Sequence, residues 1–454
     1  MLSETVLALS NWQMTLTSLL HYVFTPLTLG LSLLLVVLEI RLILKQDASL
    51  KPTIQFWARV FAIQFVLAMS TRLLVVIQYG VSTSFFARFI GDNFALPIAI
   101  ESISSFFLIS ALFGPFWFGW NQLSDKQHAL VTGLISLCLH ISALWLISAY
   151  AWLDNPSAVS FNPLSLRIET EDSWQLLNPP ELGQHSLHAI GLAYAIAAGF
   201  ILSICAWFKL AQPGHPISQH SQSVAAIFGI VSVLALSVHG QTEALSLSQR
   251  IQQNTLRGVD NQSLLPEIQQ HIRTGLDAYR ALKTWREDEK NAPLAASFNQ
   301  QKADVGYAML LKRWLSKIET ASDTHIRLAA ESILPSHPLA LFWGHKSLMP
   351  MGVISLVIFA LALLPTAKFN GVLLSALPIN ALMVAIDLMI QHCLHQAWLV
   401  DGVLPRFIAY SSLSTSEQVL AGGFYSLALL TTMSLSVFFT LHIIRSQQIC
   451  GAPS

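Results

Sequence analysis

The stretch LLSALPINALMVAIDLMIQHCLHQAW (373–398) decides the fold class of this chain. Its first part, residues 373–389, is almost entirely apolar, as expected of a membrane-crossing helix, which needs about 20 mostly apolar residues. His392 and His395 follow three positions apart, and on a helix two such residues share one face. Ionisable side chains in a membrane are costly and commonly mark a functional site. The stretch therefore predicts a membrane helix that carries a site near its end.

The composition of the whole chain is that of a membrane protein. Of its 454 residues, 53% are hydrophobic and 11% are charged, with a mean hydropathy of +0.55, whereas soluble domains average about 25% charged residues. The 25 basic and 25 acidic residues cancel, so nothing indicates a nucleic-acid partner. The four cysteines show neither a CxxC pair nor zinc spacing, and three of them lie in apolar segments, which favours a role of these three as small hydrophobic residues.

Nine segments are long and apolar enough to cross a membrane. The N-terminal MLSETVLALS has no basic region and no cleavage site, so we expect the first segment to be uncleaved. The predicted fold is an all-α membrane protein, a bundle of nine transmembrane helices. The segments are residues 13–41, 57–80, 94–119, 127–151, 187–210, 221–239, 345–365, 371–394 and 420–444.

The only long polar stretch follows the sixth predicted helix. Residues 240–340 are rich in charges and helix formers, as in EIQQHIRTGLDAYRALKTWREDEKN, so we expect a long, partly helical extramembrane loop. A loop of this length is commonly functional. The chain thus divides into residues 1–239 with six helices, the loop 240–340, and residues 341–454 with the last three helices and a C-terminal tail.

Basic residues gather on one side of this predicted topology. By the positive-inside rule that side faces the cell interior, whereas the acidic segment 154–181 lies on the opposite side. We therefore expect the N-terminus and the long loop outside and the C-terminus inside. The basic residues are Arg41, Lys45, Lys51, Arg59, Lys126, Lys209, Lys368 and Arg445.

Several predicted helices carry side chains of the types that can bind metal or move protons. Histidine and methionine are common ligands of haem iron, and without a Cys-x-x-Cys-His motif any haem would be held non-covalently. Beyond the histidines at 392 and 395, the residues are His21 in the first helix, Glu101 in the third, His188 in the fifth, and Lys346 and Met349 at the start of the seventh.

Each of these residues also has a simpler structural interpretation. A membrane histidine can bond to a carbonyl of a neighbouring helix, and Met349 can be ordinary core. Glu101 can be a structural carboxyl that burial keeps neutral, or the proton carrier of an ion transporter. From the residues alone, these alternatives stay open.

Together with their surroundings, the same residues resemble subunit I of the cytochrome bd quinol oxidases over nearly the whole chain. LTSLLHYVFTPLTLGLSLLL resembles the first helix of that family, whose histidine binds haem, which implies this role for His21. YGVSTSFFARFIGDNFALPIAIE resembles the start of its third helix, and Glu101 falls on the glutamate assigned to proton delivery near the haems. LHAIGLAYAIAAGFILSICAWF resembles its fifth helix, which implies that His188 binds the low-spin haem b. IRTGLDAYRAL, DVGYAMLLKRW and VLPRFIAYSSLS resemble the second half of its loop and the stretch after the eighth helix.

The end of the eighth helix departs from the family pattern. The family normally shows Gly-Trp-x-x-x-Glu-x-Gly-Arg-Gln-Pro-Trp, and this chain reads DLMIQHCLHQAW. The resemblance implies that His392 ligates the high-spin haem b in place of the glutamate. It implies that His395, at the arginine position, is a hydrogen-bond donor beside a ligand or a haem propionate. A neutral imidazole stabilises ferric iron less than an anionic oxygen does, so we expect a raised potential for that haem.

The third and seventh helices differ from the family as well. Ile109 stands where the family has its second acidic residue of the third helix. Lys346 replaces the arginine of the seventh helix, which implies a group beside the haem ligands or a propionate partner. Leu348 aligns with the methionine ligand, so either Met349 or His345 is expected to be the sixth ligand of the low-spin haem.

The quinol region is altered too. Where the family carries Lys and Glu for quinol, this chain has Gln252 and Arg257. We therefore expect the quinol region at these two residues, with changed chemistry.

The resemblance implies an enzyme that oxidises quinol at the long loop and reduces oxygen to water. Electrons would pass from the low-spin haem b at His188 to a high-spin haem b and to haem d or a third haem b, near His392 and His21. Protons would arrive from the inside past Glu101. The expected partners are subunit II, often a very small single-helix subunit, and the lipid of a bacterial inner membrane.

Two other functions stay open at this stage. The first is a bd-like haem oxidoreductase subunit that has lost standard quinol oxidation and uses another donor or acceptor. The second is a non-catalytic membrane scaffold or a transporter.

Overall fold

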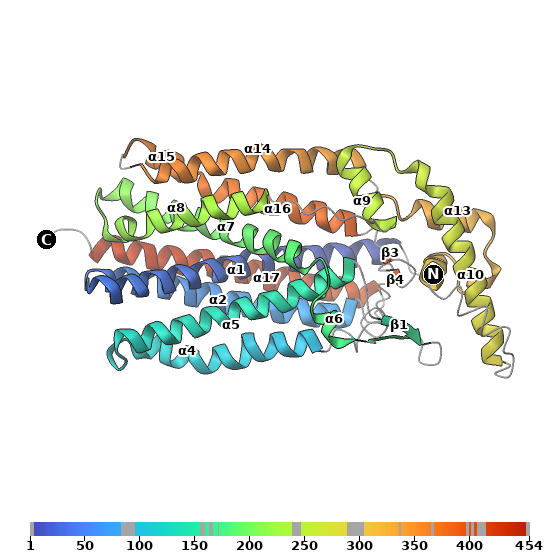
Figure 1. Cartoon of the computed structure of the whole chain (residues 1–454), viewed down its shortest axis with the longest axis horizontal. Coiled ribbons are helices and arrows are strands. Elements are labelled where there is room, and N and C mark those ends of the chain that lie inside the picture. Colours follow the sequence, from blue (N-terminus) through green and yellow to red (C-terminus); the bar gives the residue numbers. More distant parts are fainter. Residues whose placement is uncertain are drawn as a thin grey trace.

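A computed structural model shows the chain as a bundle of long helices with a layer of shorter elements at one end (Figure 1). Within the part of the chain that the structure describes, nine segments are long and apolar enough to cross a membrane. The predicted nine-helix bundle is therefore confirmed. The described residues are 4–82, 96–154, 159–162, 167–170, 172–237, 247–287, 304–335, 337–364, 367–395, 399–400, 404–405 and 415–450.

The membrane segments follow the order expected from hydropathy, with ends that differ by a few residues. The third of them is composite: residues 96–102 are helical, a π-helical turn spans Ile103–Leu108, and α4 (Ile109–Phe118) follows. The others are α1 (Glu4–Lys45), α2 (Leu50–Ser82), α5 (Asp125–Asp154), α7 (Leu182–Ala211), α8 (Pro216–Leu236), α14 (Pro338–Ala362), α15 (Asn370–Leu373) with α16 (Ala376–His395), and α17 (Thr415–Cys450).

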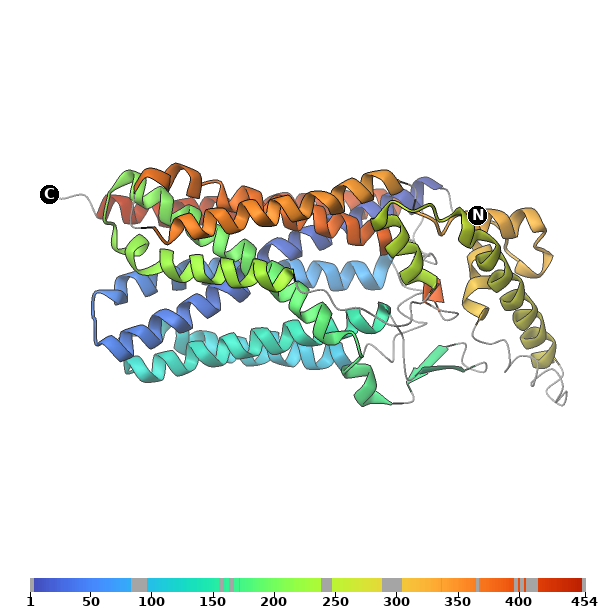
Figure 2. The same cartoon turned by 45° about the horizontal axis from the view of Figure 1, so that its top comes forward.

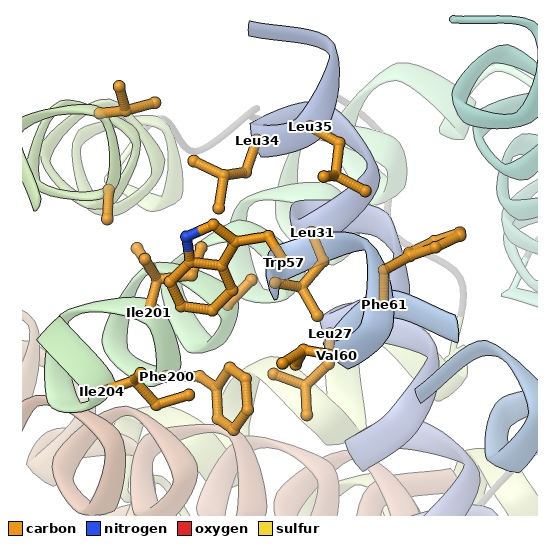
Figure 3. Close-up of a cluster of buried hydrophobic side chains, with 14 of the residues drawn as sticks. Leu27, Leu31, Leu34, Leu35, Trp57, Val60, Phe61, Phe200, Ile201 and Ile204 are labelled. Carbon is orange, nitrogen blue, oxygen red and sulfur yellow. The ribbon is translucent and has the colours of Figure 1, made fainter. Parts of the chain in front are cut away.

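The centre of the bundle is the packing of α1, α2 and α7. Trp57 of α2 lies among leucines of α1 and isoleucines of α7 (Figure 3), and its indole donates to Ser221 Oγ of α8 at 2.7 Å. α1 and α7 approach closely because Gly30 faces Ala197, with no room for a side chain between them. Small residues allow this approach, which drives helix association in lipid, where burial of apolar surface alone gives no advantage.

The stretch predicted as a long loop forms a separate small core. Its helices are α9 (Leu247–Arg257), α10 (Leu265–Glu287), α12 (Val305–Met309) and α13 (Asp323–Glu331). Ile251, Ile272 and Ile326 are buried together between them. Apolar residues at helical spacing thus give these polar helices one packed face.

This layer lies at the end of the bundle where α1 begins, opposite the C-terminus (Figure 2). The short α6 (Ser173–Leu177) and an antiparallel hairpin of β1 (Val159–Asn162) and β2 (Arg167–Thr170) lie at the same end. The two-residue strands β3 (Leu399–Val400) and β4 (Leu404–Pro405) also pair. The connections with most of the basic residues lie at the other end, where Lys51 and Asp125 form an ion pair of 2.8 Å. The layer of shorter elements and most of the basic connections thus lie at opposite ends of the bundle.

Candidate functional site

His21 lies in α1 against α2 and is held by hydroxyl groups. Thr25 Oγ1, one turn further along α1, is 3.2 Å from its Nδ1 and 3.3 Å from its Nε2. Thr71 Oγ1 of α2 is 3.3 Å from Nδ1. Hydroxyl groups rotate to suit their partner and both donate and accept, so this arrangement accommodates a ring nitrogen that binds another group.

Glu101 lies beside the same part of α2 and is almost fully buried, with 3% of its surface exposed. The Arg72 guanidinium donates to Glu101 Oε2 at 3.1 Å. Two serine hydroxyls donate to Oε1, from Ser105 at 3.0 Å and from Ser142 of α5 at 3.2 Å. Because Arg72 directly follows Thr71, the His21 and Glu101 environments adjoin through α2.

The backbone after Glu101 forms a π-helical turn that places a serine hydroxyl on the Glu101 carboxyl. The π-helical turn Ile103–Leu108 buries Ser104 and Ser105, and the Ser105 hydroxyl bonds back to Glu101. Such turns in a membrane-spanning segment frequently occur at functional sites. The carboxyl is thus held by the Arg72 guanidinium on one oxygen and by serine hydroxyls on the other.

His188 of α7 forms a second site with a residue that the sequence analysis did not single out. Its Nε2 lies 3.1 Å from Oδ2 of Asp387 on α16. The Asp387 side chain is 9% exposed and that of His188 is 41% exposed. Metal-ligating histidines commonly hydrogen-bond a carboxylate, which orients the ring, and Asp387 fits that role.

The start of α14 presents its candidate ligands in different directions. Leu348 is half-buried against Leu341 and Ile390, whereas Met349 is 78% exposed and lies off this packed face. His345 is half-buried. Lys346 is exposed, with its Nζ 5.6 Å from the Phe342 ring centroid. The structure thus does not bring Met349 toward the neighbouring helices.

Four other candidate residues lie on α16 and α9. His392 and His395 belong to α16, the helix of Asp387, but their side chains lie outside the described residues. Gln252 and Arg257 both lie on α9 in the extramembrane layer, half-buried and exposed respectively. In the described part of the chain, no group of three His, Cys, Asp or Glu side chains could hold a metal ion. A haem iron does not need such a group, because the protein supplies only its axial ligands.

The fold and these buried sites define a multi-pass α-helical membrane protein with histidines and carboxylates between its helices. Comparison with known families makes the assignment more specific. The family model described as "Cytochrome bd terminal oxidase subunit I" matches residues 9–257, and the chain belongs to this family. The resemblance seen in the sequence is confirmed, and the family is one of membrane oxidoreductases of the respiratory chain.

Individual relatives agree with this assignment. The chain is 24% identical over 491 aligned residues to "Cytochrome bd-II ubiquinol oxidase subunit 1" of Escherichia coli (strain K12), with 95% of each chain covered. It is 32% identical over 260 residues to "Cytochrome bd ubiquinol oxidase subunit 1" of Bacillus subtilis (strain 168), covering 57% of this chain and 55% of that one. "The structure of bd oxidase from Geobacillus thermodenitrificans" contains a chain of the same fold, with a TM-score of 0.70, 15% identity and coverage of 97% of this chain and 100% of that one.

Proposed function

We propose that this chain is the haem-carrying subunit I of a bacterial cytochrome bd-type terminal oxidase, which oxidises quinol and reduces oxygen to water. The names of the relatives as ubiquinol oxidase subunits support the reaction. The observation that carries the proposal is the buried Arg72–Glu101 pair next to His21. In the proposal it combines His21 as a ligand for iron with Glu101 as a proton-handling group inside the membrane.

The residues around His21 fit a haem. Arg72 is engaged with Glu101 through one terminal nitrogen, while its buried Nε has no hydrogen-bond partner among the described residues. A buried donor without a partner is costly, and a carboxylate such as a haem propionate would satisfy it. In the proposal His21 holds haem d or a third haem b.

The α7–α16 pair fits a second haem. His188, oriented by Asp387, would hold the low-spin haem b, with Met349 or His345 of α14 as the other ligand. Because Met349 lies off the packed face of α14, its ligation would need a rotation of that helix start. His345 is half-buried and is the alternative ligand.

The remaining sites are assigned from the family pattern. His392, on α16, would ligate the high-spin haem b. Lys346 and His395 would pair with propionates. Gln252 and Arg257 of α9 mark the quinol region, in the layer that the positive-inside rule puts outside.

The bound haems supply one-electron transfer and oxygen binding, and the protein supplies ligands, charge and proton access. Oxidation of two quinols releases four electrons and four protons, and reduction of one oxygen to two waters consumes the same numbers. Glu101 would take up a proton and pass it on, with the Ser105 and Ser142 hydroxyls directing its Oε1. With quinol protons released outside and oxygen protons taken from inside, the reaction itself builds a membrane potential.

Exposed apolar faces leave room for partners. In α17 only 12% of the most apolar window is buried, and in α14 only 22%. Subunit II, a small single-helix subunit and membrane lipid would cover such faces. The N-terminus would face outside and the C-terminus inside.

A second candidate function is a bd-like haem subunit that uses another electron donor or acceptor. It is favoured by the chemistry of α9, where exposed Arg257 and half-buried Gln252 replace the family pair. The neutral amide of Gln252 and the permanent cation of Arg257 cannot accept a proton from quinol. These two replacements would explain the loss of quinol oxidation.

Oxygen consumption by the purified complex separates the two functions. A short-chain ubiquinol kept reduced by dithiothreitol is the donor, with an artificial one-electron donor run in parallel. The proposal predicts rapid oxygen uptake with ubiquinol. Uptake with the artificial donor alone would support the second candidate with another donor. Uptake with neither would contradict the proposal and would leave, of the second candidate, only a subunit with an acceptor other than oxygen.

A further inference from the structure

A carboxyl and an imidazole are buried together at the end of the bundle opposite the long loop. Glu39 Oε1 of α1 lies 3.1 Å from His128 Nδ1 and 3.0 Å from the Thr132 hydroxyl, both of α5. His128 Nε2 is 3.1 Å from the Phe116 carbonyl. The other carboxyl oxygen of Glu39 is buried and has no hydrogen-bond partner in the described part of the chain. Ionisable groups at such depth are costly and are usually functional.

The polar contact between α1 and α5 continues deeper into the bundle. One turn beyond Thr132, Ser136 of α5 meets Ser32 of α1, with 3.0 Å between their hydroxyl oxygens. Both serines are buried. Hydroxyls both donate and accept, so this pair can receive a proton on one side and release one on the other.

On α1 the polar residues form a single line that ends at His21. Glu39, Ser32, Thr28, Thr25 and His21 all lie within about 40° of one face at 100° per residue, over about 27 Å of helix. Near its end, the Thr28 hydroxyl donates to the Thr25 carbonyl at 2.7 Å, and Thr25 contacts His21. We call these α1 residues together with His128, Thr132 and Ser136 the α1–α5 polar seam.

The spacing along the seam suits transfer through water. Successive polar levels are one helical turn apart, about 6 Å along α5 from Thr132 to Ser136. In the proposed route, a single water with hydrogen bonds to both levels would span such a gap. At its far end the seam reaches His21 and Thr71, which adjoin the Arg72–Glu101 pair.

The Glu39–His128 end of the seam lies near the basic face of the bundle. A surface pocket there is lined by residues that include Leu42, Gln46, Lys51 and Asp125. Leu42 follows Glu39 by three positions, and Asp125 precedes His128 by three. The pocket therefore lies within about one helical turn of the buried pair, at the end of the bundle from which the proposed protons would come.

The helix that carries Glu101 offers no comparable route. From Glu101 toward the same face it continues into α4, with the sequence ISALFGPFWF and no ionisable side chain. Ile109, about two turns from Glu101, is fully buried. Apolar packing interrupts the line of polar groups at this point, whereas the α1–α5 polar seam has a hydrogen-bonding side chain at nearly every turn.

We infer that the α1–α5 polar seam conducts protons from the inner face of the membrane to the His21–Glu101 site, with Glu39 and His128 as the first acceptors. The inference rests on the proposed function, because oxygen reduction is the reaction that would consume these protons. No other reactant is needed: each proton moves from water to Glu39 or His128 and onward through the hydroxyls.

The test uses the complete complex in proteoliposomes, with a short-chain ubiquinol as donor. The double variant Ser32→Ala/Ser136→Ala removes the hydroxyl pair with little change in volume, and Glu39→Gln removes the first carboxyl. Each is expected to lower steady-state turnover and proton uptake roughly tenfold or more. The haem content and the rate of carbon monoxide binding should stay as in the wild type.

Ser148→Ala is the matched control. Ser148 is fully buried on the same helix, but its hydroxyl donates to the Leu177 carbonyl outside the seam, so turnover should be unchanged. Wild-type turnover in both seam variants would overturn the inference. A fall in haem content that accompanies the loss of turnover would show a structural role and would overturn it as well. A wild-type complex without haem would instead remove the proposed function, a failure that the haem assay identifies on its own.

Discussion

Arg72 of α2 donates to Glu101 at 3.1 Å inside the membrane bundle, and the two side chains are 16% and 4% exposed. Residue 71, directly before this arginine, contacts His21. A carboxylate in lipid is tolerated when a cation neutralises it. Because the two charges compensate each other, the pair allows a charged glutamate next to His21, the proposed haem ligand. Either charge alone at this place would be uncompensated.

Replacing the arginine tests this dependence. Arg72→Gln should destabilise the complex by about 3–5 kcal/mol, because loss of one partner leaves a buried charge without compensation. The measurement is the thermal melting temperature in detergent, with haem content read in parallel. Arg72→Lys keeps the charge and should recover much of the stability. Equal melting temperatures for Arg72→Gln and the wild type would show that Glu101 does not need the cation.

Asp387 is predicted to act through His188. Asp387→Asn keeps the size of the side chain but removes the charge that orients the imidazole, so the affinity for the low-spin haem should fall by about 10–100-fold. His188→Ala should remove the low-spin haem b signal and leave the other haems largely in place. A haem titration of the two variants checks this. Full haem occupancy in both would show that His188 is a structural histidine that only joins α7 to α16.

The α1–α7 contact at Gly30 should tolerate no added side chain. Gly30→Leu should destabilise the bundle by more than the usual overpacking cost of about 1–3 kcal/mol, because its Cβ alone would overlap Ala197. Gly133→Ala on α5 is the control, since a Cβ there would meet nothing within 4 Å. Melting temperatures of the two variants give the comparison. A stable Gly30→Leu complex would mean that α1 and α7 lie further apart.

Features that depend on neighbouring residues could be predicted from the sequence, whereas contacts between residues far apart in the chain could not. The nine spans were predictable because a run of apolar residues is a local property. His21, His188 and Glu101 stood out for the same reason, as isolated polar residues within such runs. Their partners did not stand out: Arg72 is 29 positions from Glu101, Asp387 is 199 from His188, and Glu39 is 89 from His128.

Pairs at such separations depend on helix order and rotation, which hydropathy does not specify. Met349 illustrates the difficulty. The sequence suggested Met349 as a ligand because it is one residue from the position that aligns with the methionine of the family. On a helix, however, adjacent side chains point in directions about 100° apart. The structure accordingly shows Leu348 packed and Met349 exposed. Lone charges in predicted spans, such as Arg72 and Asp387, are the signal that would have found the missed residues.

His392 is the residue at which the proposed haem ligation departs from the family. If it binds the high-spin haem b, His392→Ala should deplete that haem and stop oxygen reduction. His392→Glu should retain the haem and lower its midpoint potential, because an anionic ligand favours ferric iron. A redox titration of both variants gives the answer. Unchanged haem content and potential in both would assign His392 to hydrogen bonding within the bundle.

The central claim is that this chain carries haem at His21 and His188. The reduced-minus-oxidised optical spectrum of the purified complex tests it most directly, for the wild type beside His21→Ala and His188→Ala. The predicted result is a wild-type spectrum with b-type bands and, for haem d, a band far to the red. His188→Ala should lose the low-spin b bands, and His21→Ala should lose a different component. A wild-type complex without haem bands, or two variants with the full wild-type spectrum, would contradict the account.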